Sequence, residues 1–395
     1  MLLAGLMALN ALAIDIMLPA LPEIGLDLGA TAANDRQAVI TAYLTGFGVG
    51  QFLMGPLSDR FGRRPLLLLG LALYVAAAAG GALAEGFATM LAARALQGFG
   101  SAAPRVIVTA LVRDCYEGRA MARVTSYTMM VFMAAPVVAP SLGQAVLFAG
   151  PWRWIFALLA VYGLALLWLS ATRLPETLPP ERRRGLGAGA LWRGLGLVFG
   201  SRQTVGYALA SGVFFGALFG FIASAQQILG ELYALGPLFP LMFGALAVLI
   251  AVAAFVNARL VERIGMRRLS HGAVLGFTAL SAALAALSLS DQPPLWLFAT
   301  LIAAAMTLVG LVFANFSALA MEPQAAVAGL ASSMIGGFST LIGAGIGFLI
   351  GRAYDGTVTP LALGYVCAGA GALLVLLATE RGRLFAAAPP ELRRR

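Results

Sequence analysis

The sequence predicts an all-α integral membrane protein with twelve transmembrane helices, arranged as two pseudo-symmetric bundles of six. Three observations lead to this fold class. Of the 395 residues, 61% are hydrophobic and only 11% are charged, whereas soluble domains are nearer half apolar and a quarter charged. Apolar runs of about 20 residues, long enough to cross a hydrocarbon core of about 30 Å, recur along the chain. A short internal repeat relates the two halves.

Each apolar run is expected to be helical, because an unpaired backbone finds no hydrogen-bond partner in lipid. The first run opens at Met1 without a basic segment or a small-residue cleavage site, so we interpret it as a retained helix rather than a signal peptide. The predicted spans are residues 1–20, 37–56, 65–84, 88–112, 124–148, 152–172, 203–228, 233–257, 270–290, 294–319, 327–351 and 359–379.

The arginines predict the orientation. All 26 basic residues are arginine, and with a cytoplasmic N-terminus 21 of them fall in cytoplasmic loops and tails. Only Arg36, Arg153 and Arg352 fall on the opposite side. Cytoplasmic loops are enriched in basic residues, so we expect a bacterial inner-membrane protein with both termini in the cytoplasm. The concentration of arginine in the cytoplasmic loops beside the lipid bilayer then accounts for the net charge of +9, without a nucleic-acid partner.

A polar stretch divides the chain. LPETLPPERRR, from Leu174 onward, is followed by a glycine-rich run, and residues 173–202 are predicted to be a cytoplasmic linker. It would join bundles at 1–172 and 203–380, with a cytoplasmic tail at 381–395. The repeat supports this division, since LSDRFG (Leu57–Gly62) aligns without gaps with LVERIG (Leu260–Gly265), each after the second span of its half.

The most specific motif is GPLSDRFGRRP (Gly55–Pro65), in the short loop after the second span. Gly55 and Gly62 permit a cramped turn, Asp59 can face a helix N-terminus, and Arg60, Arg63 and Arg64 form a basic rim. The motif resembles the signature loop of the major facilitator superfamily, whose fold has twelve helices in two halves. The alternative is a basic loop that only sets topology.

That resemblance implies a gate. In the family, the acidic residue and the second arginine of the loop form a charge relay with an acidic residue at the end of the fourth helix. The matching positions here are Asp59, Arg63 and Asp114. The resemblance implies that this cluster latches the halves in the outward-open state and is not a substrate site.

Charges are rare within the predicted spans, which contain Asp15, Arg94 and Arg105. An ionisable group at mid-bilayer costs about 3 kcal/mol on insertion scales, so we take these residues as a proton-coupling site. Arg94 and Arg105 are eleven residues apart and share a helix face. Arg94 lies in LAARALQGFG, which resembles the family's R-x-x-Q-G motif for proton coupling. The alternatives are an Arg94 that extends to the interface and an Asp15 that caps the outer end of its helix.

Asp15 is the candidate proton carrier, and as the only acid within the spans it predicts one proton per cycle. The fifth span contains APVVAPSLGQ (Ala135–Gln144), which resembles the antiporter motif G-P-x-x-G-G of exporters. Pro136 and Pro140 would bend the helix and Gly143 would permit close packing. Ala139 and Gln144 depart from the motif.

The substrate cavity is predicted to be apolar with few polar anchors, as binding of lipophilic drugs requires. The second half has no charge within its predicted spans, so the lining must be aromatic or amide side chains. Such residues can instead face lipid or pack against other helices. The candidates are Tyr127, Met130, Phe215, Phe219, Gln226 and Asn315.

Motifs along both halves, including IDIMLPALP, PWRWIF, LPETLPPERR, EPQAAVAGLASS and GRAYDGT, resemble the Bcr/CflA (bicyclomycin and chloramphenicol resistance) branch of drug:proton antiporters. The resemblance implies a monomer that exports small amphipathic molecules in exchange for protons, with the proton gradient in place of a cofactor. The alternative within this fold is a proton-coupled importer or exporter of a sugar, organic acid or amino acid.

Enzymatic functions find no support in the sequence. A chain without lysine has no Walker A motif for ATP. Cys115 and Cys367 lie far apart, and His271 is the single histidine, so disulfide frameworks, zinc sites and a Ser-His-Asp triad are not expected. A membrane enzyme or receptor would need a catalytic set or a sensor domain, and neither is visible.

Overall fold

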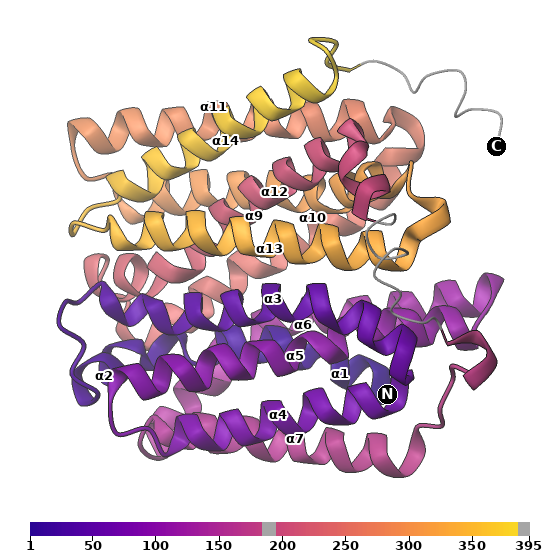
Figure 1. Cartoon of the computed structure of the whole chain (residues 1–395). Helices are drawn as coiled ribbons and strands as arrows, with labels where there is room; N and C mark the ends of the chain where they lie inside the picture. The colour runs from indigo at the N-terminus through magenta and orange to yellow at the C-terminus, as the bar shows by residue number, and fades with distance from the viewer. Residues whose placement is uncertain (184–194, 386–395) are drawn as a thin grey trace.

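The computed structural model describes residues 1–183 and 195–385. These residues contain twelve helical segments long and apolar enough to cross a membrane, so the predicted fold class is confirmed. Figure 1 shows them as two bundles, α1–α7 below and α9–α14 above, with the start of α1 and the end of α14 at the same side of the molecule. We call that side the terminal end and the opposite side the distal end.

The helices of the first bundle are α1 (Leu2–Asp15), η1 (Leu18–Ala20), α2 (Leu21–Asp27), η2 (Asp35–Gln37), α3 (Ala38–Phe61), α4 (Arg63–Ala82), α5 (Phe87–Cys115), α6 (Gly118–Ala149) and α7 (Arg153–Arg173). Those that follow are η3 (Pro180–Arg182), α9 (Arg202–Ala225), η4 (Gln226–Leu232), η5 (Gly236–Leu238), α10 (Phe239–Ile264), α11 (Met266–Ser290), α12 (Leu295–Met321), η6 (Ala325–Val327), α13 (Ala328–Arg352) and α14 (Thr359–Thr379).

The first span is longer than predicted. Helix α1, the short η1 and α2 together form one apolar segment, Leu2–Asp27, of 26 residues, so its predicted end at residue 20 was wrong. Pro19 and Pro22 each lie in the first turn of η1 or α2. A proline costs little there because the first amide groups of a helix have no intrahelical partner. These prolines therefore restart the helix instead of ending it.

The internal repeat has the same geometry in both halves. One glycine separates α3 from α4, and one separates α10 from α11. Gly62 has φ 103° and Gly265 has φ 86°, a region that side chains with a Cβ rarely adopt. The aligned glycines thus make the same sharp turn at the terminal end of each bundle.

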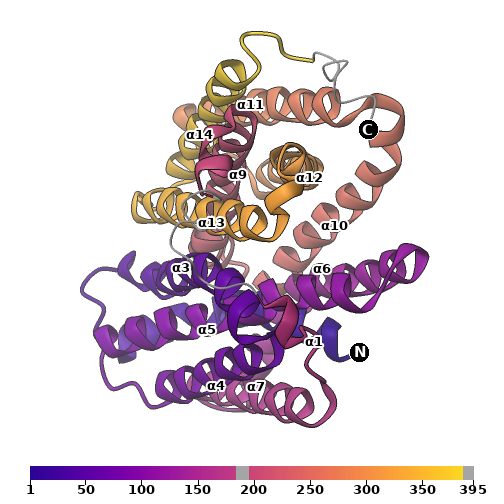
Figure 2. The same cartoon turned by 45° about the vertical axis from the view of Figure 1, so that its right-hand side comes forward.

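The two bundles meet along a seam between α3 and α13, which lie side by side in Figures 1 and 2. Glycines permit the close approach. A Cβ at Gly337 would lie 2.9 Å from the Gly48 carbonyl oxygen. A Cβ at Gly55 would overlap the Ser333 hydroxyl, near the terminal end, and one at Gly351 the Gln37 amide, at the distal end. The seam is therefore closed over its whole length.

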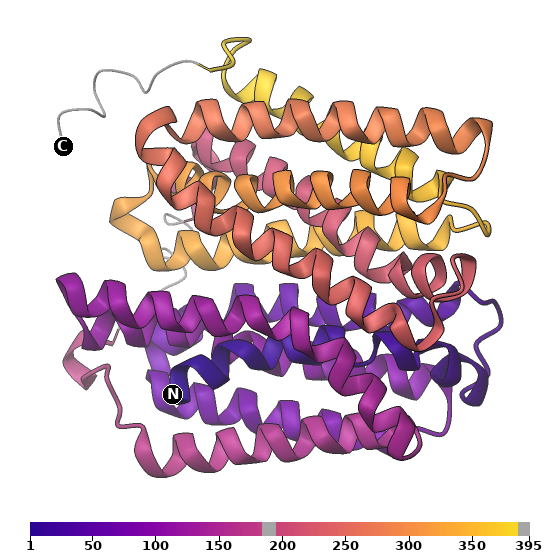
Figure 3. The same cartoon turned by 180° about the vertical axis from the view of Figure 1, so that it is seen from behind.

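On another side, α6 and α10 touch near the distal end, where a Cβ at Gly244 would lie 2.8 Å from the Val137 carbonyl oxygen. They separate toward the terminal end (Figures 2 and 3). Met129, Met130 and Val131 of α6 are all exposed, and consecutive residues point about 100° apart on a helix. This part of α6 is therefore exposed around most of its circumference.

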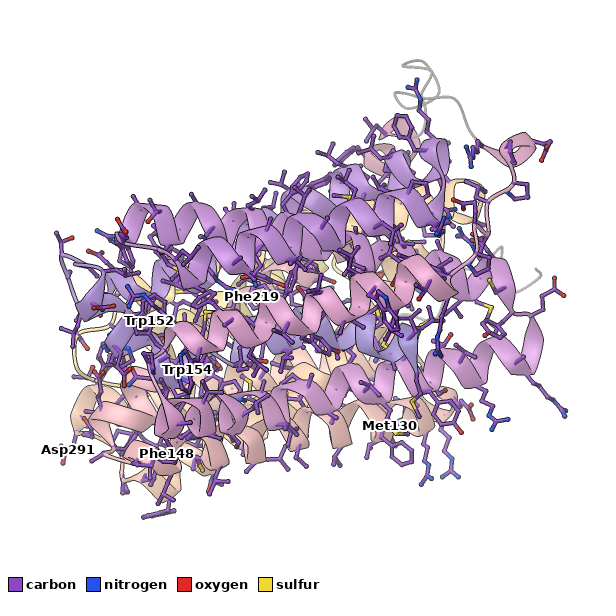
Figure 4. The ribbon with its side chains drawn as sticks, turned by 90° about the horizontal axis from the view of Figure 1, so that it is seen from below. Met130, Phe148, Trp152, Trp154, Phe219 and Asp291 are labelled. Atoms are coloured by element: carbon purple, nitrogen blue, oxygen red, sulfur yellow. The ribbon has the colours of Figure 1, made fainter. Side chains whose placement is uncertain are left out.

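Aromatic side chains mark the distal end. In Figure 4, Phe148, Trp152 and Trp154 lie at the same end as Asp291, whereas Met130 lies toward the other end of the same helix as Phe148. Trp154 and Phe148 are exposed and Trp152 is buried. Trp152 Nε1 donates to Asp27 Oδ2 at 3.0 Å, which fastens the end of the first span to the start of α7. Exposed tryptophans at this level are typical of a membrane–water interface.

Candidate functional site

Asp15 lies deep in the first span. It is the last residue of α1 and the fourteenth of the 26 residues in Leu2–Asp27, about 20 Å along the helix. Its side chain is 3% exposed, and Oδ1 has no hydrogen-bond partner among the described residues. Pro19 also lacks the N–H that would bond the Asp15 carbonyl in a continuous helix. The structure therefore places Asp15 near the middle of the span and not at its end.

Arg94 is fully buried in α5 and does not extend to the interface. Its Nη2 donates to the Ala13 carbonyl oxygen at 3.1 Å, Nε to the Val39 carbonyl oxygen at 3.2 Å and Nη1 to Gln97 Oε1 at 2.6 Å. The guanidinium also lies over the Tyr43 ring, 4.4 Å from its centroid. Carbonyl dipoles and an aromatic face thus solvate this charge, and no ion pair joins it to Asp15 in the described chain.

A polar network that sequence reasoning missed continues from Arg94 across the first bundle. The Tyr43 hydroxyl lies 2.9 Å from Asn10 Oδ1 and 2.8 Å from Ser101 Oγ. The Gln97 Nε2 atom and the Tyr74 hydroxyl are buried without a partner among the described residues. One signal was available: Gln97 and Ser101 follow Arg94 by three and seven residues, which puts all three on one face of α5.

Arg105, also in α5, occupies a different place. Its Nη1 lies 3.8 Å from Met7 Sδ, and its guanidinium lies 5.0 Å from the centroid of the Phe132 ring. Met7 precedes Asp15 by eight residues, about 12 Å along a helix. The structure thus brings Arg94 close to Asp15. Arg105 instead lies beside the half of α1 that is nearer the terminal end.

At the terminal end, Asp59, Arg63, Asp114 and Glu176 form the first-half ionic cluster. Arg63 Nη1 lies 2.6 Å from Asp59 Oδ1, and Arg63 Nε lies 3.2 Å from Asp114 Oδ2. Glu176 Oε1 accepts the backbone N–H of Arg63 at 3.0 Å, where a carboxylate is favourable at the start of α4. Arg60 is exposed and lies over the Phe61 ring. The loop motif therefore builds a buried cation with three carboxylates.

Asp59 also faces the second bundle. A Cβ at Gly329, in the first turn of α13, would lie 4.0 Å from Asp59 Oδ2. The carboxylate thus sits at the N-terminus of α13, whose helix dipole favours a negative charge. The cluster belongs to the first bundle, and among residues 1–183 and 195–385 this approach to α13 links it to the second bundle.

The second bundle has an equivalent arrangement, the second-half ionic cluster of Arg267, Glu322 and Glu380. Arg267 Nε donates to Glu380 Oε1 at 3.0 Å, and Nη2 lies 3.5 Å from Glu322 Oε2. Tyr207 donates its hydroxyl to Glu380 Oε1 at 2.6 Å. Glu322 and Glu380 lie at the ends of the fourth and sixth spans of their half, as Asp114 and Glu176 do in the first half.

One expectation changes here. The second half was predicted to have no charge within its spans, which is wrong, because α11 starts at Met266 and contains the buried Arg267. His271 is fully buried, 3.1 Å from the Tyr207 hydroxyl, and its Nδ1 accepts the Phe385 N–H at 3.2 Å. It is thus part of the packing at the terminal end. In the described part of the chain, no group of His, Cys, Asp and Glu could hold a metal ion.

At the distal end, polar contacts that the sequence did not suggest join the two bundles. We call them the distal clasp, formed by Asn34, Arg36 and Gln37 of the first bundle and Gln227, Glu231, Arg352 and Tyr354 of the second. Arg36 Nη2 pairs with Glu231 Oε1 at 2.7 Å. Asn34 Nδ2 donates to the Tyr354 carbonyl oxygen at 2.7 Å and to that of Arg352 at 3.0 Å. Because every contact crosses from one bundle to the other, the clasp closes the distal end.

Gln227 holds the centre of the clasp. Its Nε2 donates to Asn34 Oδ1 at 2.8 Å, and its Oε1 accepts from Gln37. Gln227 lies in η4, a π-helical segment that continues α9. Such segments are rare and often occur at functional sites, because one extra residue per turn redirects the side chains. The first-half ionic cluster and the distal clasp are thus formed in the same structure.

The proline motif of α6 lies beside Asp15. Pro136 and Pro140 are both inside the helix, where each removes one backbone hydrogen bond. A Cβ at Gly143 would overlap the Ile16 carbonyl oxygen, so only glycine fits there. The motif thus places α6 directly against the break in the first span, one residue from Asp15.

The candidate cavity residues lie in different environments. Tyr127 and Met130 of α6 are exposed. Phe215 stacks on Phe219, with centroids 5.6 Å apart, and on Phe313 at 4.3 Å. Asn315 is buried and its Nδ2 donates to Asn257 Oδ1 at 2.7 Å, so its amide joins α12 to α10.

Gln226 lies at the start of the π-helical η4, buried, with Oε1 unpartnered among the described residues. It therefore neighbours the distal clasp, whereas Phe219 and Phe215 lie about two and three helical turns earlier in α9. The six candidates do not form one cluster in this structure.

Both the sequence and the fold are similar to those of known transporters. Residues 3–348 match the family profile of the Major Facilitator Superfamily. An uncharacterized MFS-type transporter of Bacillus subtilis, YdgK, is 34% identical over 378 residues, which is 94% of this chain and 93% of that protein. A bicyclomycin resistance protein homolog of Haemophilus influenzae is 30% identical over 350 residues, 88% of this chain and 87% of that one.

Among solved structures, the xylose transporter XylE of Escherichia coli in a partially occluded inward-open conformation superposes with a TM-score of 0.76. The match covers 95% of this chain and 96% of XylE, at 15% sequence identity. At that identity, the likeness shows the fold alone.

Proposed function

Because the chain belongs to the Major Facilitator Superfamily, we propose that it is a proton-coupled antiporter that exports small, amphipathic, drug-like molecules by alternating access. The similarity to a bicyclomycin resistance protein homolog supports drug export. In this proposal the halves 1–172 and 203–380 move as units, joined by the linker 173–202, and the chain works as a monomer in the bacterial inner membrane.

One observation carries the proposal: the proline motif of α6 packs directly on the segment that holds a membrane-buried acid. Gly143 contacts the Ile16 carbonyl, and Asp15 precedes Ile16 at mid-span with one oxygen unbonded. A change in the charge of Asp15 would therefore alter the packing of α6 against the first span. Helix α6 is the one that separates from α10 toward the terminal end. This contact offers a physical route from protonation to opening.

The two ends of the seam receive gating roles in this proposal. The first-half ionic cluster, with Asp59 at the N-terminus of α13, would hold the terminal end shut, and the distal clasp would hold the distal end shut. Alternating access requires that one set of contacts breaks while the other forms. The α6–α10 side would then provide the path, since those helices separate toward the terminal end.

The function is tested in liposomes with an imposed pH gradient. We expect labelled chloramphenicol, a neutral probe, to accumulate in proteoliposomes whose interior is the more acidic side, because outward proton flow then drives uptake. Accumulation only with an acidic exterior would indicate import. Flux in either direction that is unchanged when nigericin collapses the gradient would contradict proton coupling.

The orientation is tested with the two cysteines, both exposed. Cys115 ends α5 at the terminal end, whereas Cys367 lies in the middle of α14 and should face lipid. A membrane-impermeant maleimide is expected to label Cys115 in inside-out vesicles and not in intact cells. The Cys115→Ser variant should lose the label, whereas Cys367→Ser should retain it. Labelling of Cys115 in intact cells would reverse the orientation.

The terminal-end arginines, on which this orientation rests, include Arg60, Arg64, Arg113 and Arg173. Five others that enter the sequence argument lie outside the described residues, namely Arg184, Arg193, Arg393, Arg394 and Arg395.

A further inference from the structure

Arg105 is a cation at membrane depth that the proposed cycle leaves unused. It lies ten residues before the end of α5, about 15 Å from the terminal end. Its guanidinium makes no ion pair and no hydrogen bond to an oxygen atom among residues 1–183 and 195–385; its contacts are Met7 Sδ and the Phe132 ring. Arginines at such depth pair with carboxylates or carbonyl groups, or they mark a substrate path.

The contrast with Arg94 makes Arg105 informative. Arg94 lies seven residues from the start of α5, yet each of its nitrogens bonds a protein oxygen and it is fully buried. Arg105 is partly exposed, and in the described part of the chain only its Nη1 is within reach of a protein acceptor, the weakly accepting thioether of Met7. Its remaining N–H donors are therefore available to a ligand.

The contacts of Arg105 also orient it. A guanidinium stacked on an aromatic face keeps its edge, where the N–H donors lie, free to bind. That edge matches the two oxygens of a carboxylate in a bidentate pair. Phe132 and Met7 add apolar surface beside the charge, which suits a ligand with an apolar body. One cation without another charged partner among the described residues balances a single negative charge.

We propose that Arg105 binds the carboxylate of amphipathic organic monoanions, so that substrates of this chain include aromatic or aliphatic acids. This inference rests on the proposed transport function, and it separates the roles of the two arginines of α5. Arg94 belongs with the Asp15 segment, whereas Arg105, whose contact Met7 lies about 12 Å from Asp15 along α1, contacts the substrate.

The test compares two probes of the same shape in the purified full-length protein: 2-naphthoate, which is ionised at neutral pH, and 2-naphthamide, which is neutral. Binding is measured in detergent by the ligand-dependent shift in melting temperature, without any gradient. Wild type should prefer the acid. In Arg105→Gln this preference should fall about 10- to 100-fold, the usual worth of hydrogen bonds to a charged group. Arg105→Lys should retain part of it, since it keeps the charge and loses the fork.

Arg259→Gln is the matched control. Arg259 also stacks on an aromatic ring, that of Phe255 at 4.6 Å, but it is exposed near the terminal end of α10. Its removal should leave the preference for naphthoate unchanged, although the net charge falls equally. Equal binding of acid and amide by wild type, binding of neither, or an unchanged preference in Arg105→Gln would each overturn the inference.

Because this measurement uses no proton gradient, its outcome is independent of the export experiment. Loss of gradient-driven chloramphenicol transport with a retained acid preference would overturn the proposed antiport and leave the anion site standing. The opposite pair of results would remove the anion site alone.

Discussion

Replacing Asp15 with asparagine is expected to abolish accumulation of chloramphenicol against a gradient while leaving downhill flux and exchange intact. Each pH unit is worth about 1.4 kcal/mol per proton, so exchange of one proton for one neutral molecule supports at most about tenfold accumulation per unit. An asparagine side chain carries no proton, and the accumulation ratio should therefore fall to one. Because Asp15 Oδ1 makes no hydrogen bond among the described residues, replacing it with the amide nitrogen of asparagine breaks no hydrogen bond.

The control for this experiment is Glu23→Gln. Glu23 lies on the same span, in α2, and is exposed, so removing its charge should leave accumulation unchanged. If Asp15→Asn still concentrates the probe, the proton is carried elsewhere, and the first-half ionic cluster is the next candidate. A measured stoichiometry above one proton per cycle would also contradict Asp15 as the single carrier.

Replacing Arg63 with glutamine is expected to be the most destabilising change at the terminal end. Arg63 is buried and compensates Asp59 and Asp114. Removal of one partner of a fully buried ion pair costs about 3–5 kcal/mol, and the cost should be lower here because the side chains of Asp59 and Asp114 are 30% and 19% exposed. The variant should melt at a clearly lower temperature in detergent, and its transport rate should fall with the loss of the closed terminal end.

Arg60→Gln provides the comparison in the same loop. Arg60 is exposed and has no ion pair in the described chain, so its loss should change stability by less than about 0.5 kcal/mol. Adding Asp59→Asn and Asp114→Asn to Arg63→Gln should recover part of the lost stability, since the uncompensated charges are removed. Asp59→Asn alone should slow cycling and leave binding of the probe nearly unchanged. A variant Arg63→Gln as stable as Arg60→Gln would contradict the cluster as a structural unit.

The sequence was sufficient to predict the fold. Hydropathy identifies the segments that cross the membrane, and such segments must be helical because lipid offers the backbone no hydrogen-bond partner. The first span shows where it was insufficient. Pro19, Pro22 and the acids at 23 and 27 resemble a loop, and only the structure shows the chain passing on as η1 and α2. That difference moved Asp15 from the expected end of the span to its middle.

The site was harder to foresee because its parts come from separate helices. The family motif groups Asp59, Arg63 and Asp114. The contacts of Tyr43 with Asn10 and Ser101, by contrast, depend on how α1, α3 and α5 pack together. The distal clasp uses asparagine and glutamine side chains, which are common in loops and carry no recognisable spacing. Gln227 also depends on a π-helical turn, and helical periodicity would have assigned its side chain to another face.

The glycine-lined seam between α3 and α13 has a mechanical consequence. Bulky side chains that interlock would resist rotation, because each ridge would have to leave its groove. At Gly48 and Gly337 the two backbones approach each other, and the side chains of Leu341 and Phe52 fit into the space beside these glycines, so the bundles share a narrow line of contact about which they can rotate. The middle of the line stays closed during the movement, which limits leakage of water and ions there, while the contacts at its two ends break and form in turn. The α6–α10 side moves with them.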